Sequence, residues 1–215
     1  MEKTQLLKEF SHMPPVTQQD IQAFCVHCVA MRGIWNHRRA LFDGPSPERQ
    51  SLHRIAPLFF RDLDLLLIEH LILQICKITD PEESRGQTNL TLEFLVNHAD
   101  FSEAPQEIVT LRQLRARMQG FREKILPQRN KLIGHLDRDA ALKRPAWGGE
   151  AAADWAQFWR DLQDFLGILH AHFIDPRGGF DLDAAAGASD AEGLAAALEG
   201  SAARGAEPRQ RGQNR

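Results

Sequence analysis

The sequence lacks the features from which secreted and membrane proteins are built. Its 215 residues include three cysteines, too few for a disulfide framework, which favours a reducing compartment. Its most apolar stretch, residues 63–78, is interrupted by charged side chains and contains no run long enough to span a membrane. The first ten residues are charged and lack the apolar core of a signal peptide. We therefore expect a soluble, cytoplasmic protein.

An excess of charge of one sign is also lacking. The chain has 26 Lys and Arg against 29 Asp and Glu, a net charge of −3, so any nucleic-acid binding must come from a local patch. Glycine-rich phosphate loops are absent, which excludes dinucleotide and nucleoside-triphosphate chemistry. Cys25 and Cys28 have no second close pair of ligands, so we expect them to be buried structural thiols. No metal and no cofactor is expected.

The pattern of apolar residues predicts helices throughout. Tyrosine is absent, and no stretch alternates apolar and polar residues between turns, so no sustained strand is predicted. Thr17 is a plausible helix N-cap with Asp20 as its partner. The second long helix is apolar on nearly all sides after Leu63 and should be the most buried. The fold class is all-α, an antiparallel bundle of four long helices with short extra helices. The long helices are expected over about residues 17–42, 51–78, 105–136 and 151–174, and a short one near 90–98.

The chain divides into three parts. Residues 1–16 form an N-terminal segment, residues 17–175 form the helical bundle, and residues 176–215 form an Ala/Gly-rich tail. Of the 40 residues in the tail, 18 are Ala or Gly, which leaves little apolar side chain to bury. We expect the tail to be flexible, with one short helix over residues 190–198.

Positive charge gathers between residues 112 and 131, with a local charge of +6. A helix with charges of one sign indicates an anionic partner. The alternative is that acidic residues of neighbouring helices neutralise it, and the sequence leaves both interpretations open. The basic residues are Arg112, Arg115, Arg117, Arg122, Lys124, Arg129 and Lys131, against the single acid Glu123.

The same helix carries an apolar stripe. On a helical wheel of about 100° per residue, Arg129 and His135 border this stripe on opposite sides, so both should be half-buried. Pro127 either kinks the helix or begins a new one, which would place Arg129 near free N–H groups suited to phosphate. Gly134 either permits close approach by a partner backbone or substrate, or is merely tolerated. The stripe consists of Leu114, Met118, Phe121, Ile125, Leu132 and Leu136.

The segment from Arg129 to His135, RNKLIGH, resembles the active-site motif of the HEPN superfamily. That motif is an Arg followed by several residues and a His, with a polar residue directly after the Arg, here Asn130. Two further segments, KITDP at 77–81 and NLTL at 89–92, are similar to the abortive-infection (AbiU-type) branch of the superfamily. Gly134 stands where that family usually has Ala. The resemblance covers roughly residues 15–175.

The resemblance implies a metal-independent endoribonuclease, a toxin or phage-defence effector, that works as a homodimer with its two motif helices facing each other. His135 would act as general acid or base on the ribose 2′-hydroxyl or the leaving oxygen. Arg129 would stabilise charge on the phosphate, leaving a 2′,3′-cyclic phosphate. These residue types suit that chemistry, because His titrates near neutral pH and Arg binds phosphate through two N–H groups.

Partners follow from the same resemblance. RNA contacts are expected from Asn130, Lys131, Arg122 and Lys124, and an antitoxin protein is a further expected partner. The stripe would form the seam of the homodimer. One alternative is a non-catalytic HEPN-like module that binds RNA, a nucleotide or a protein. Another is a generic bundle in which the Arg and His are coincidental.

Overall fold

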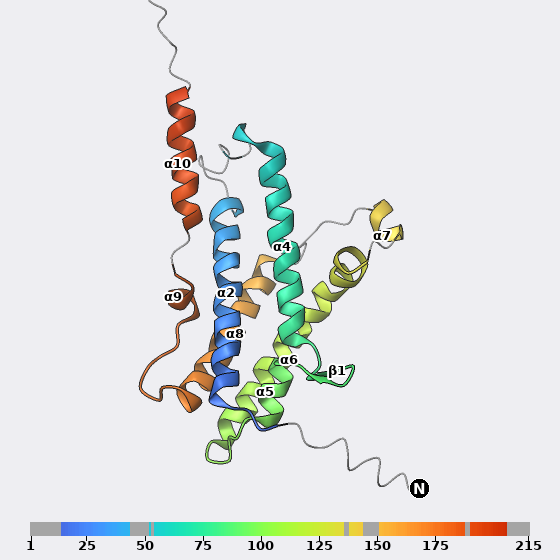
Figure 1. Ribbon diagram of the computed structural model, residues 1–215, viewed down its shortest axis with the longest axis vertical. Helices are drawn as coiled ribbons and strands as arrows, with labels where there is room; N and C mark the ends of the chain where they lie inside the picture. Colours follow the sequence, from blue (N-terminus) through green and yellow to red (C-terminus); the bar gives the residue numbers. More distant parts are fainter. Residues whose placement is uncertain are drawn as a thin grey trace, which may run out of the picture.

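The computed structural model describes residues 14–43, 52, 54–135, 138–143, 151–187 and 190–205. Successive long helices run in opposite directions, and α2 and α4 lie in front of α6 and α8 in Figure 1. The predicted all-α class, with four long helices and short extra ones, is confirmed. The long helices are α2 (Gln18–Phe42), α4 (Pro57–Thr79), α6 (Pro105–Gln128) and α8 (Ala152–Phe173). The shorter ones are α5 (Leu92–His98), α7 (Arg138–Lys143), α9 (Leu182–Ala186) and α10 (Asp190–Gly205).

The start of α2 was correctly predicted from its capping residues. Oγ1 of Thr17 accepts a hydrogen bond from the N–H of Asp20 at 3.2 Å, and the Asp20 carboxylate accepts one from the N–H of Thr17 at 2.8 Å. This reciprocal capping box satisfies two backbone donors at the helix end. The glycine and prolines of residues 44–47 predict the end of this helix, but they lie outside the described residues.

One hydrophobic core joins α2, α4, α5, α6 and α8. The spacing of the large apolar residues between 151 and 174 predicts one inner face for α8, and the structure confirms it, since Trp155, Phe158 and Trp159 are each at most 4% exposed. None of the described helices is long and apolar enough to cross a membrane. The other buried members of this α8 face are Leu162, Phe165, Leu166 and Leu169.

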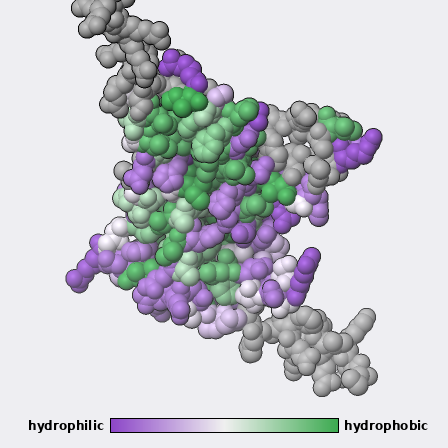
Figure 2. Space-filling model, turned by 45° about the horizontal axis from the view of Figure 1, so that its top comes forward, coloured by the Kyte–Doolittle hydropathy of each residue, from purple (hydrophilic) through white to green (hydrophobic). Residues whose placement is uncertain are grey.

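Helix α4 has nine buried residues, more than α2, α6 or α8, as predicted, but it is not buried on all sides. From Ile68 onward it packs between its neighbours, but Leu58, Phe59 and Leu66 are 64%, 63% and 62% exposed. An apolar residue on every side of a helix does not ensure burial, because neighbouring helices cover only part of its surface. Figure 2 shows hydrophobic residues at the surface over the upper half of the molecule, where α4 begins.

The polar loop after α4 contains a hairpin that the sequence did not predict. Strands β1 (Glu83–Ser84) and β2 (Gln87–Thr88) pair antiparallel around Arg85 and Gly86, whose φ angles are 53° and 76°. Two positive φ angles are typical of the tight turns that join such strands. Strands of two residues are too short to produce a visible alternation in the sequence.

The segment after α8 folds back along α2 (Figure 1). Leu182 of α9 is buried, and Ala191 and Ala195 of α10 pack with Leu41 and Phe60 in a second small cluster. The structure thus differs from the single short helix expected here. Small side chains bury little area, but they let α10 approach α2 closely, and α9 adds one larger apolar residue.

Candidate active site

The RNKLIGH motif lies where α6 changes from an α-helix to a π-helix, η1 (Arg129–Ile133). Pro127 is contained within α6, and the N–H of Arg129 donates to the carbonyl oxygens of Ile125 and Leu126. Of the two alternatives for Pro127, the one in which it begins a new helix with free N–H groups near Arg129 is therefore wrong. The N–H of Gly134 donates to the carbonyl oxygen of Arg129 at 2.7 Å, a span of five residues. Such π turns occur frequently at functional sites.

This π turn changes where the two motif side chains lie. Arg129 is half-buried, as the helical wheel predicted, but His135 is exposed. The wheel assumes the same rotation at every residue, whereas a π-helix holds more residues in each turn. His135 is therefore displaced from the position that an unbroken α-helix would give it. An exposed His is open to a substrate or to a second chain.

The apolar stripe of α6 packs within its own chain. Leu114, Met118, Phe121 and Ile125 are each at most 5% exposed, and the ring of Phe121 contacts that of Trp155 in α8 at 5.0 Å between centroids. This part of the stripe is not available to a partner, so the predicted use of the stripe as a dimer seam is wrong for these residues. Leu136 and the side chain of Leu132 lie outside the described residues.

Asn130 holds the guanidinium of Arg129. Its Oδ1 accepts a hydrogen bond from Nη1 of Arg129 at 2.8 Å, and the Asn130 side chain is otherwise exposed. Helix α4 lies beside this pair, because η1 packs against it. Burial raises the pKa of Cys76 in α4 to about 11, and the charges of Arg122, Asp80 and Arg129 also act on that thiol. The Arg129 guanidinium therefore lies near the C-terminal end of α4.

Most of the basic residues of α6 are neutralised, as one of the two interpretations predicted. Arg122 pairs with Asp80 at 2.6 Å and Lys124 with Asp154 at 2.8 Å. Arg112, Arg129 and Lys131, in contrast, have no ion pair with any carboxylate that the structure describes. The free positive charge thus lies at the two ends of the stretch. The two other neutralised residues are Arg115, paired with Glu93, and Arg117, paired with Asp161.

Sequence reasoning did not select Asp80 as a site residue, although it lies in the KITDP segment. It follows the last residue of α4, and its carboxylate joins that helix end to α6, seven residues before Arg129. The Arg122 side chain in this pair is 15% exposed. The pair therefore fixes the place where η1 passes α4. The resemblance of KITDP to the abortive-infection branch was the signal that could have identified it.

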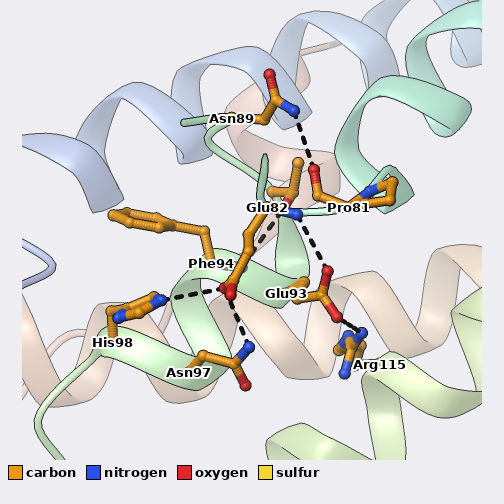
Figure 3. Close-up of polar contacts among 9 residues, drawn as sticks. Pro81, Glu82, Asn89, Glu93, Phe94, Asn97, His98 and Arg115 are labelled. Atoms are coloured by element: carbon orange, nitrogen blue, oxygen red, sulfur yellow. Dashed lines mark hydrogen bonds and ion pairs between the residues drawn. The ribbon is translucent and has the colours of Figure 1, made fainter. Parts of the chain in front are cut away.

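A polar network holds the segment between α4 and α5 in place (Figure 3). Nδ2 of Asn89 donates to the carbonyl oxygen of Pro81 at 3.0 Å, which links the NLTL and KITDP segments. The N–H of Glu82 donates to Oε2 of Glu93 at 3.0 Å, and Glu93 in turn pairs with Arg115 of α6. The two segments therefore have a structural role where α4 and α5 meet α6.

The carboxylate of Glu82 extends this network to the end of α5. Its Oε2 accepts a hydrogen bond from Nδ2 of Asn97 at 3.0 Å and lies 3.1 Å from Nε2 of His98 (Figure 3). Thr91 caps the start of the same helix, because its Oγ1 accepts a hydrogen bond from the N–H of Phe94. Helix α5 is thus held at both ends against the loop that follows α4.

The chemistry available at η1 is acid–base and electrostatic. An exposed imidazole can transfer a proton, and an oriented guanidinium can stabilise negative charge on phosphate. Among the described residues, no group of three or more His, Cys, Asp or Glu is placed to hold a metal ion. The predicted burial of Cys25 and Cys28 is confirmed, at 6% and 0% exposure.

Comparison with known proteins identifies the family. No curated protein and no solved structure matches the chain. The HEPN_AbiU2 family, described as AbiU2, matches residues 21–174. This range runs from the first turn of α2 to the end of α8. It contains the RNKLIGH motif and the polar network between α4 and α5. The chain therefore belongs to the AbiU2 family of HEPN domains.

Proposed function

We propose that this protein is a metal-independent endoribonuclease of HEPN type, acting as a toxin or phage-defence effector. One observation carries the proposal: the π turn of η1 presents an exposed His135 after an Arg129 that Asn130 holds in place. Both side chains lie within the range that matches the family. An acid–base group and an oriented cation are what in-line cleavage of RNA requires.

In the proposed reaction, His135 accepts the proton of a ribose 2′-hydroxyl. The 2′-oxygen attacks the adjacent phosphorus, the bond to the 5′-oxygen breaks, and that oxygen takes up a proton. The products carry a 2′,3′-cyclic phosphate and a 5′-hydroxyl. Arg129 stabilises the negative charge that develops on the phosphate, and the exposed Lys131 contacts the RNA backbone.

The other predicted RNA-binding residues have more limited roles in this proposal. Lys124 is 52% exposed beside Asp154, so its ammonium can still meet RNA at the surface. Arg122 acts mainly through its ion pair with Asp80, as a positioning residue for η1. Asn130 likewise acts through Arg129. RNA binding thus rests chiefly on the free cations near the end of α6.

We further propose that the active form is a homodimer. Because the stripe residues Leu114, Met118, Phe121 and Ile125 are buried within the chain, a second copy must pack on another face. Leu58, Phe59 and Leu66 of α4 are apolar and mostly exposed, and Val26 of α2 is 70% exposed. Because η1 packs against α4, a second copy bound to the exposed apolar residues of α4 would lie near the RNKLIGH motif. Exposed apolar side chains of this kind commonly mark interaction sites.

The test compares wild type with His135→Ala and Arg129→Ala on total cellular RNA in EDTA. Wild type is expected to cleave, leaving 2′,3′-cyclic phosphate ends, and both variants are expected to lose cleavage. Arg112→Ala is the matched control, because Arg112 is an exposed cation on the same helix and far from η1. Binding of the RNA in a gel-shift assay without cleavage by wild type would instead favour a non-catalytic module. Cleavage retained by His135→Ala would overturn the proposed mechanism.

A further inference from the structure

A second candidate site lies between α2, α8 and α9. The cavity there has a volume of about 700 Å³, and none of the motif residues lines it. A volume of this size is typical of pockets for small molecules. Four arginines line the cavity, Arg32, Arg38, Arg39 and Arg160, beside three tryptophans, Trp35, Trp155 and Trp159.

Two of these arginines are held on tryptophan rings. The guanidinium of Arg32 lies 4.9 Å from the ring centroid of Trp159, and that of Arg38 lies 5.9 Å from that of Trp35. The two arginine side chains are only 11% and 19% exposed. When a guanidinium stacks on an indole ring, its N–H groups point outward in the guanidinium plane. They remain free to donate hydrogen bonds to an anion beside the ring.

Arg32 already holds an anion in this way. Its Nε and Nη2 donate to the two carboxylate oxygens of Asp183 at 2.5 and 2.7 Å, and Asn36 adds a longer bond of 3.5 Å. Two parallel bonds from one guanidinium are the geometry with which Arg recognises both carboxylates and phosphates. Asp183 comes from the five-residue helix α9, beyond the family match, and its side chain is 59% exposed. The carboxylate on Arg32 therefore comes from outside the part of the chain that matches the family.

The arginines that line the cavity outnumber the carboxylates that line it by one. Asp43, Asp164 and Asp183 line it together with the four arginines. Arg38 pairs with Asp43 and with Asp64, and Arg39 pairs with Asp43, so removing Asp183 leaves Arg32 without its partner. A ligand rich in acceptor oxygens would satisfy the N–H donors of Arg32.

We propose that this cavity binds a small phosphate-bearing ligand, whose phosphate replaces the Asp183 carboxylate on Arg32. A phosphate carries more charge and more acceptor oxygens than a carboxylate, so it competes well for the same guanidinium. Arg160, an exposed residue whose Nη2 donates to Gln157, supplies a second cation at the rim. This site uses none of the residues of the proposed ribonuclease reaction.

The test titrates inorganic pyrophosphate into the full chain by calorimetry. Three of the four tryptophans line the cavity, so tryptophan fluorescence provides a second readout. Saturable binding is expected. Arg32→Gln should weaken it at least tenfold, whereas Asp183→Asn should tighten it several-fold because the competing charge is gone. Asp190→Asn, an exposed acid at the start of α10, is the matched control and should leave affinity unchanged.

Several outcomes separate this proposal from a purely structural role for the Arg32–Asp183 pair. Both variants break that pair, so a structural role would move their affinities in the same direction. No binding by wild type or by Asp183→Asn would overturn the proposal, as would equal affinity for Arg32→Gln. A second titration with ADP identifies the class of the natural ligand. Tighter binding of ADP than of pyrophosphate indicates a nucleotide, and equal affinity indicates a phosphate compound that is recognised without a base. Either result supports the site.

Discussion

The N–H of Gly134 donates to the carbonyl oxygen of Arg129 at 2.7 Å, and this bond closes the π turn that carries the motif. A Cβ atom at position 134 would lie 3.1 Å from that same oxygen, closer than ordinary van der Waals contact. The close contact at this glycine is therefore with the backbone of its own helix. The backbone of Arg129 and the residue before His135 are in direct contact.

The first prediction compares the same substitution at two glycines. Gly120 is exposed within α6 and has open space around it, so Gly120→Ala should raise the free energy of unfolding by about 0.5–1 kcal/mol. Gly134→Ala should raise the free energy of unfolding by less, because the new methyl group lies too close to the carbonyl oxygen of Arg129. Urea unfolding of both variants measures the difference. Equal gains would show that the π turn does not constrain position 134.

The second prediction concerns the ion pair between Asp80 and Arg122. Asp80→Asn leaves a largely buried guanidinium without its charge partner, so we expect a loss of about 1–3 kcal/mol in stability and a lower cleavage rate. Asp62→Asn on the same helix is the control. Asp62 pairs with Arg61 at the surface, where both side chains are about 60% exposed, and its loss should change stability by less than about 0.5 kcal/mol.

The third prediction tests Asn130 as a positioning residue. Asn130→Ala removes the acceptor for Nη1 of Arg129, so cleavage should fall roughly tenfold, the effect of about 1.4 kcal/mol, while RNA affinity changes little. Gln113→Ala, a loss of an exposed amide on α6, should leave the rate unchanged. A parallel loss of RNA affinity in Asn130→Ala would instead assign Asn130 a direct contact with RNA.

The elements that the sequence predicted well have local causes. The start of α2 follows from Thr17 and Asp20, which lie one helical turn apart and cap the helix without help from the rest of the fold. The inner face of α8 follows from the regular spacing of large apolar residues. Capping residues and apolar spacing therefore sufficed to predict the four long helices.

The features that the sequence did not predict depend on neighbours. Whether Leu66 is buried depends on which helices pack beside α4, and the neutralisation of Lys124 depends on Asp154, 30 positions later in the chain. The exposure of His135 depends on a π turn, which no apolar periodicity signals. The motif residues could therefore be named from the sequence, but their surroundings could not.

The fourth prediction is a loss of stability at alkaline pH. Burial raises the pKa of Cys25 and of Cys76 to about 11. In the unfolded chain these thiols ionise near their ordinary pKa of about 8.5. Between about pH 9 and 11 the unfolded chain therefore binds fewer protons than the folded one, and the free energy of unfolding falls.

Unfolding by urea at several pH values measures this slope, to which each thiol contributes up to about 1.4 kcal/mol per pH unit. The chain has no tyrosine, which removes one group that would otherwise titrate in the same range. The variants Cys25→Ala and Cys76→Ala should each flatten the slope. An unchanged slope in both would contradict the raised pKa values.

The fifth prediction concerns the α4 face proposed for the homodimer. Leu66 is 62% exposed, so Leu66→Glu should fold normally, yet it places a charge at the centre of the proposed contact. Sedimentation velocity at micromolar concentration should show a dimer for wild type and a monomer for the variant, with cleavage reduced at least tenfold. Val109→Glu is the control, because Val109 is also apolar and 45% exposed but lies near the start of α6. A wild type that sediments as a monomer and still cleaves RNA would show that one chain suffices, and that His135 and Arg129 act within a single subunit.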